Sequence, residues 1–206
     1  MLEYLIAGTT LGLAAGISPG PLLVMVVSET LKSDRKEGVK LAFVPLISDL
    51  PIVLLSLFVV YKISDSDLVL AAISFLGSAF LVYLSLENLR VKPLAIKKNK
   101  ISRNSLWKGV LVNLFSPHPY LFWMLVGAPF AIKAYNESIW FAILFVAGFY
   151  VFIVGTKITI AFLAEKSKKF ISGKGYVMVI KTLGFVLFIF SVILVKDGLK
   201  FLGILS

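Results

Sequence analysis

The chain has no cysteine and only one histidine among its 206 residues. Without cysteine it can form no disulfide bridge, thiolate metal site or dithiol redox centre. Charged residues make up only 16 % of the sequence, against about 25 % in typical soluble proteins. The sequence also lacks the Gly-x4-Gly-Lys-Ser/Thr loop that cradles nucleotide phosphates, so we do not expect this chain to couple ATP directly.

Apolar residues dominate what is present, at 59 % of the chain with a mean hydropathy of +0.96. A soluble fold cannot bury so much apolar surface, and a membrane-spanning helix needs about 20 apolar residues. Long apolar runs separated by short polar breaks predict an all-α membrane protein, a single polytopic domain over residues 1–206. The six predicted transmembrane helices are Tyr4–Ser28, Val39–Tyr61, Leu68–Leu89, Trp107–Ile132, Ser138–Leu163 and Tyr176–Val195.

The basic residues predict the orientation of these spans. Most of the 21 lysines and arginines fall in or beside the first, third and fifth polar breaks. Cytoplasmic loops collect such residues, so we expect these breaks to face the cytoplasm and both termini to lie outside. The same distribution argues against nucleic acid as a partner despite a net charge of +10. We predict a multi-pass protein of the cell (inner or plasma) membrane.

The first and fourth spans carry matching interruptions, Ser18-Pro19-Gly20-Pro21 and Ser116-Pro117-His118-Pro119. Paired prolines remove backbone donors and break the helical ladder. In lipid such a break persists only where protein or a water-filled cavity satisfies the freed groups. With three spans in each half, the halves run in opposite directions, which predicts a 3+3 inverted repeat of residues 1–92 and 103–206. The alternative is that each proline pair only kinks its helix.

Broken helices in inverted-repeat transporters meet near the midplane and form the substrate site, where half-helix N-termini attract anions. Asn113, one turn before the second break, can bind a substrate or serve helix packing, and both interpretations stay open. The candidate substrate-binding residues are therefore Ser18, Pro19, Gly20, Pro21, Asn113, Ser116, Pro117, His118 and Pro119.

Two charged residues lie well inside predicted spans, Asp49 in the second and Lys157 in the fifth. A charge at the bilayer centre costs about 3 kcal/mol on insertion scales, so it usually faces a partner or a water path. We expect both residues to face one interior cavity. The alternatives are a structural ion pair, or a Lys157 side chain that extends towards the membrane surface.

His118 is a third candidate for proton or charge coupling, because histidine changes its charge near physiological pH. A lone histidine is more often a satisfied polar residue than a proton relay. With no cysteine, one histidine and one deep acid, the chain offers a poor ligand set for a divalent transition metal. We therefore predict no metal site and no cofactor.

Glycine recurs at every fourth position of the first span, at Gly8, Gly12, Gly16 and Gly20. Small residues at this spacing allow two membrane helices to approach closely. We interpret the stripe as a packing surface, except for Gly20, which belongs to the break.

At these residues the chain resembles the lysine-exporter (LysE/RhtB-type) family of amino-acid exporters over essentially its whole length. The resemblance rests on the glycine-rich first span ending in Ser18-Pro19-Gly20-Pro21, the basic turn after it, and Asp49. The fourth span is similar to the family's Asn-Pro-Lys segment, but Ser116-Pro117-His118 stands in its place, so the usual lysine is missing. The resemblance implies proton-coupled export of amino acids or similar small solutes, and it leaves a homo-oligomer open.

The sequence thus favours a secondary exporter of a small-molecule amino acid that works by alternating access in the lipid bilayer. The substrate carboxylate would bind N–H groups at the two breaks, and its ammonium group would be attracted to Asp49. Proton entry would neutralise Asp49 or charge His118.

The main alternative is an exporter of a metal or other inorganic ion on the same scaffold. An intramembrane enzyme lacks a matched nucleophile and base, and in a non-transporting scaffold the buried charges would serve no purpose.

Overall fold

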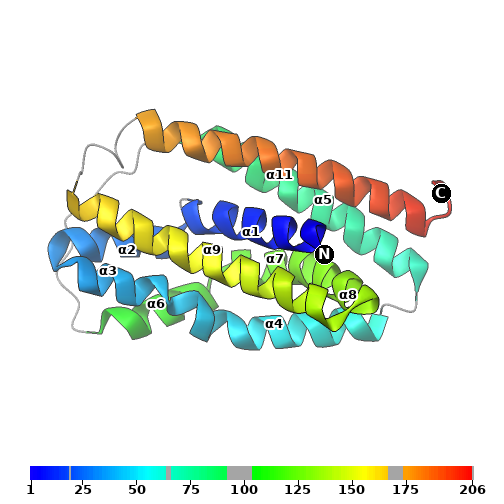
Figure 1. The fold of residues 1–206 in the computed structure, drawn as a ribbon, viewed down its shortest axis with the longest axis horizontal. Helices are drawn as coiled ribbons and strands as arrows, with labels where there is room; N and C mark the ends of the chain where they lie inside the picture. Colours follow the sequence, from blue (N-terminus) through cyan, green and yellow to red (C-terminus); the bar gives the residue numbers. More distant parts are fainter. Residues whose placement is uncertain (19, 64–65, 92–103, 167–173, 206) are drawn as a thin grey trace.

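The computed structural model describes residues 1–18, 20–63, 66–91, 104–166 and 174–205 (Figure 1). All regular structure within these ranges is helical, and most of the helices run along the long axis of the molecule. In chain order the elements are α1 Leu2–Ile17, α2 Pro21–Lys32, α3 Arg35–Ala42, α4 Val44–Ile63, α5 Asp67–Leu89, α6 Ser105–Leu114, α7 Pro117–Phe122, the π-helix η1 Trp123–Gly127, α8 Ala128–Glu137, α9 Ile139–Lys166 and α11 Lys174–Phe201.

Four helical segments of the described chain are long and apolar enough to cross a membrane by themselves: Arg35–Ile63, Asp67–Leu89, Ile139–Lys166 and Val177–Phe201. Two further pairs pass the same test together and are bent at a short break. The bend is 60° between α1 and α2, and 52° between α6 and the helical stretch Pro117–Glu137. The described part of the chain is therefore all-α with four candidate membrane spans, or six when each bent pair counts as one. The breaks fall in the two predicted spans.

The helices extend further into the polar segments than hydropathy predicts. The first polar break was expected at Glu29–Gly38, but only Ser33 and Asp34 lie between α2 and α3. The Asp34 side chain caps α3 by accepting a hydrogen bond of 3.0 Å from the Glu37 N–H, as helix N-caps commonly do. Because backbone hydrogen bonding continues beyond the apolar stretch, hydropathy underestimates the length of these helices.

The helices associate in three groups. The first span, through α1, lies along α9; α5 lies along α11; and α4 contacts α6, α7, η1 and α8. In Figure 1, α1 lies between α9 and the α5–α11 pair. The two ends of the chain lie towards the same end of the molecule, and the α2–α3 connection lies at the opposite end (Figure 1). Much of the charge in the predicted third and fifth breaks, including Lys97 and Lys168, lies outside the described residues.

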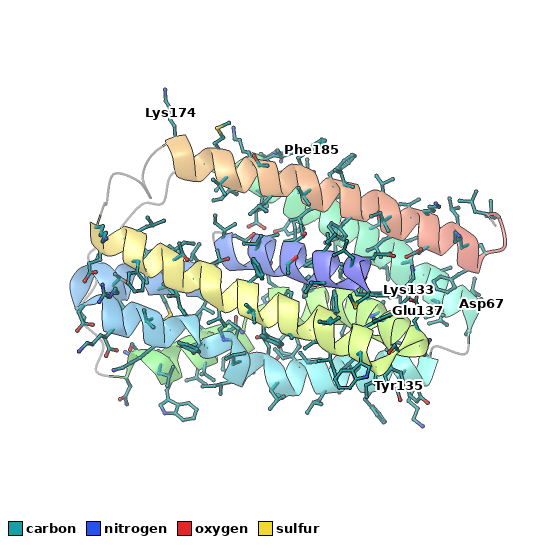
Figure 2. All side chains as sticks on the ribbon, in the orientation of Figure 1. Asp67, Lys133, Tyr135, Glu137, Lys174 and Phe185 are labelled. Atoms are coloured by element: carbon teal, nitrogen blue, oxygen red, sulfur yellow. The ribbon has the colours of Figure 1, made fainter. Side chains whose placement is uncertain are left out.

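Polar contacts join the helices near both ends of the molecule. At the end carrying the termini, the Tyr4 hydroxyl donates to the Glu137 carboxylate, and Lys133 lies 3.1 Å from the Asp197 carboxylate. Figure 2 shows Lys133 and Glu137 at this end and Lys174 at the other. At the opposite end, Arg35 pairs with Glu165 at 3.1 Å.

The glycine stripe of α1 brings its backbone against α9. A Cβ atom at Gly8 would lie 2.2 Å from the Phe145 carbonyl oxygen, and one at Gly12 would lie 2.4 Å from that of Phe149. No side chain fits at these distances, so the two backbones touch as the small-residue spacing predicts. This close packing fixes the position of α1, and with it the first break.

We predict that Gly12→Ala destabilises the protein by about 1–3 kcal/mol, because the added methyl group must push α1 and α9 apart. Unfolding in mixed detergent micelles measures the effect. The control is Gly155→Ala, since a Cβ atom at Gly155 would meet nothing within 4 Å. Equal stability of the two variants would show that the α1–α9 contact is loose.

Candidate functional site

A cavity of about 130 Å³ lies between the two breaks, bounded by α4 and α9. Its walls are mainly apolar and include the aromatic side chains of Phe80, Phe122, Trp123 and Phe149. The polar, charged and break residues singled out from the sequence that line this cavity are Ser18, Gly20, Pro21, Asp49, Asn113, Ser116, His118, Pro119 and Lys157. The fold thus brings together residues that lie up to 139 positions apart in the chain, from Ser18 to Lys157.

Each break is followed by a helix that begins at a proline, the second proline of the first break and the first proline of the second break. Pro21 and Pro117 are the first residues of α2 and α7, a position where the missing N–H costs nothing and the fixed φ suits a helix. Gly20 and Ser116 precede them with extended backbone, and neither caps its helix with a side-chain hydrogen bond. Pro117 does not line the cavity. The other proline of the first break, Pro19, lies outside the described residues.

The N-terminus of α2 lies at the cavity. The first N–H groups of a helix have no intrahelical partner, and at α2 these belong to Leu22 and Leu23, since Pro21 has none. Both leucines line the cavity. The second break presents fewer donors, because Pro117 and Pro119 both lack an N–H.

Asp49 is held by neutral hydrogen-bond donors. Its side chain is buried, with 3 % of its surface exposed. The Asn113 amide nitrogen donates to the Asp49 carboxylate at 2.6 Å and to the Ser48 hydroxyl at 2.7 Å. The Trp123 indole also interacts with the Asp49 carboxylate, although the indole N–H makes no hydrogen bond of normal geometry. The Asp49 carboxylate on α4 is therefore oriented mainly by the Asn113 amide on α6.

Lys157 is held by the first break. Its side chain is also only 3 % exposed, and its ammonium group donates to the Gly16 carbonyl oxygen at 3.1 Å. Gly16 lies in the last turn of α1, where carbonyl groups lose their intrahelical partners. The lysine thus satisfies a backbone group that the break has freed.

Asp49 and Lys157 line one cavity without forming a direct ion pair. The burial of Lys157 also differs from the extended arrangement in which its ammonium group reaches the membrane surface. Each charge is instead bound by a neutral dipole of the protein.

His118 lies at the edge of the cavity. Its side chain is half-buried, and its ring centre lies 6.4 Å from that of Tyr83, which is itself 53 % exposed. His118 therefore occupies a more peripheral position than Asp49.

Sequence reasoning misses two buried polar residues, one at the first break and one in the last turn of α2. Asn88 accepts a hydrogen bond of 3.1 Å from the Ser18 hydroxyl and ties the first break to α5. Glu29 on α2 is 6 % exposed, and one of its carboxylate oxygens has no hydrogen-bond partner. Asn88 could have been found as the only amide in its apolar span, whereas Glu29 was assigned to a polar break.

In the part of the chain that the structure describes, no group of three or more histidine, cysteine, aspartate or glutamate side chains could hold a metal ion. The described lining of the site offers one carboxylate, one ammonium group, one imidazole, amide and hydroxyl groups, and apolar walls. Such a set suits a small ligand that forms hydrogen bonds and carries charge.

Comparison with known proteins identifies one family. A family model described as LysE type translocator matches residues 13–198, a range that includes both breaks, Asp49 and Lys157. No curated protein and no solved structure matches the chain significantly.

We predict that Asn113→Ala destabilises the protein by about 1.5–3 kcal/mol, the usual value of a hydrogen bond to a charged group. Unfolding in mixed micelles measures the loss. In an Asp49→Asn background the same substitution should cost less, because the strong acceptor is already gone. Additive losses in this double-mutant cycle would mean that Asn113 does not act through Asp49.

Proposed function

The chain belongs to the LysE type translocator family, and we propose from this premise that it exports amino acids or related small zwitterionic solutes in exchange for protons. Family membership and the long apolar helices make it a multi-pass membrane protein that exports small solutes. The substrate class and the coupling are our proposal. The observation that carries it is one cavity holding a carboxylate and an ammonium group that do not pair with each other.

The substrate's two charges find complementary partners in this cavity. Its carboxylate binds the free N–H groups at the start of α2, where the helix dipole also favours an anion. Its ammonium group binds Asp49 on α4. The cavity volume of about 130 Å³ is similar to the ~150 Å³ cavity that accommodates a benzene-sized ligand, which favours small substrates.

The aromatic walls strengthen both contacts. Phe80, Phe122 and Phe149 line the cavity and keep bulk water away from the charges, so that electrostatic attraction is stronger than in solution. These apolar walls also offer room for an uncharged side chain rather than a second charge. Zwitterions with small apolar side chains are therefore the favoured substrates.

Asp49 is the proposed proton carrier. A proton on Asp49 cancels the attraction for the substrate's ammonium group. Proton entry and substrate release are therefore coupled at the Asp49 carboxyl group. The lack of a direct ion pair with Lys157 supports this role, because a lysine in contact would hold Asp49 in its charged form. Lys157 contributes positive charge to the cavity, and His118 is the alternative proton carrier at its edge.

Alternating access follows from an inverted repeat of residues 1–92 and 103–206. The packing supports this arrangement: the broken first span lies on α9 in the second half, and the broken fourth span lies on α4 in the first half. The third spans of the two halves, α5 and α11, lie against each other. Rocking of such halves about a fixed site exposes it to each side in turn.

The proposed orientation places the α2–α3 end in the cytoplasm and both termini outside. Lys36 and Lys40 lie at this end, and most of the chain's other basic residues fall in the breaks expected on the same side. Cytoplasmic loops of membrane proteins are enriched in such residues.

Proteoliposomes test the substrate class. Vesicles that contain the purified protein are loaded with a labelled small amino acid, or with a divalent metal ion, and a pH gradient is imposed. We predict gradient-dependent efflux of the amino acid and none of the metal. Metal efflux with amino acids retained would establish the alternative, an inorganic-ion exporter.

Variants in the same assay test the coupling. We predict that Asp49→Asn lowers efflux to the level of protein-free vesicles, because the substituted amide neither attracts the ammonium group nor carries a proton. Asp67→Asn, at an exposed position of α5, is the matched control and should leave efflux unchanged.

His118→Gln separates the two candidate proton carriers. We predict that it keeps gradient-dependent efflux, because the coupling depends on Asp49. If His118→Gln abolishes the response to the gradient while Asp49→Asn retains it, His118 is the carrier instead.

A further inference from the structure

A second hollow, separate from the cavity, lies between α1, α9 and α11. It has a volume of about 470 Å³ and is lined by no charged residue. Phe152 and Val179, on two of its walls, are 38 % and 45 % exposed, so the hollow opens to the outside of the protein. On a chain that spans a membrane, this outside is lipid.

The hollow is an elongated groove along α9. Its lining residues on that helix extend from Val151 to Leu163, which corresponds to about 18 Å at 1.5 Å per residue. One leaflet of a bilayer has a hydrocarbon depth of about 15 Å, half of the 30 Å core. The groove thus matches the length of a lipid acyl chain in one leaflet.

Gly155 forms the floor of this groove. A Cβ atom at this position would meet nothing within 4 Å, in contrast to Gly8 and Gly12, whose missing side chains are needed for helix contact. No other part of the described protein therefore fills the space above Gly155. Something outside the chain can lie there.

The groove ends beside positive charge. The face of α9 that lines the groove includes Thr159 and Leu163. Lys166 lies on the same face one turn further along, because residues three or four positions apart share one face of a helix. Lys174, the first residue of α11, lies at the same end of the molecule (Figure 2). Both lysines are exposed, and the neighbouring Glu165 is already engaged by Arg35.

We propose that this groove binds an anionic phospholipid, with one acyl chain over Gly155 and the headgroup phosphate at Lys166 and Lys174. Basic clusters between membrane helices recognise such headgroups. A free phosphate ion would gain nothing from the apolar groove. The positive charge at the end of the groove favours an anionic headgroup over a second copy of this chain, whose net charge is +10. The proposal does not depend on the transported substrate.

Native mass spectrometry of the purified full-length protein tests the proposal. The protein is titrated with phosphatidylglycerol or phosphatidylcholine of identical acyl chains. We expect tighter retention of phosphatidylglycerol, and a loss of about five-fold in that preference for Lys166→Ala and again for Lys174→Ala. Lys200→Ala, at the other end of α11, is the matched control and should change nothing. Equal retention of both lipids by the wild-type protein would overturn the proposal.

Gly155→Phe tests the acyl-chain contact separately. Because a Cβ atom at Gly155 meets nothing within 4 Å, we expect the ring to enter the groove, so retention of both lipids at this site should fall while Gly155→Ala retains them. Melting temperature and monodispersity show whether each variant is folded. The wild-type protein could instead be a dimer that Gly155→Phe dissociates while lipid retention stays unchanged. That result would assign the groove to a second copy and contradict the lipid site. Transport in proteoliposomes is measured independently of either result.

Discussion

Backbone groups released inside the membrane must find new partners, and the interior of this protein is arranged around that constraint. An unsatisfied carbonyl or N–H group in hydrocarbon costs several kcal/mol. At the first break Lys157 satisfies the freed carbonyl of Gly16, and Asn88 holds the Ser18 hydroxyl. The first residues of α2 line the cavity, and their N–H groups are the proposed partners of the substrate carboxylate. The groups that stabilise the break and those proposed to bind substrate are thus parts of one arrangement.

The two buried charges are kept apart by the same arrangement. Lys157 is held by a backbone carbonyl, and Asp49 by the Asn113 amide. Had they formed a contact ion pair, each would have neutralised the other, and a zwitterion would have had to break that pair to bind. Separate neutral partners keep both charges oriented towards the cavity, at the cost of burying each without a counter-ion. This cost is consistent with a site that exists to bind something else.

Helix α9 connects these features. One face receives the glycine stripe of α1, the Lys157 side chain extends to the first break, and a third region forms the lipid-facing groove at Gly155. A bound phospholipid would contact α1, α9 and α11 together, so it would join elements of both halves of the chain. Membrane composition would then act on the same helices that carry the cavity.

The sequence by itself determined the all-α class, the positions of the two breaks and most of the polar residues that line the cavity, because apolar length, paired prolines and charges at membrane depth have few compatible structures. It also predicted the packing role of Gly8 and Gly12 from their spacing. Only the tertiary structure decided that Lys157 binds the Gly16 carbonyl rather than Asp49, that Asn113 binds Asp49, and that Glu29 is buried within a helix. Contacts between residues far apart in the chain depend on how helices rotate and approach. Spacing can indicate which face of a helix is packed, but it does not indicate which residues of another helix that face meets.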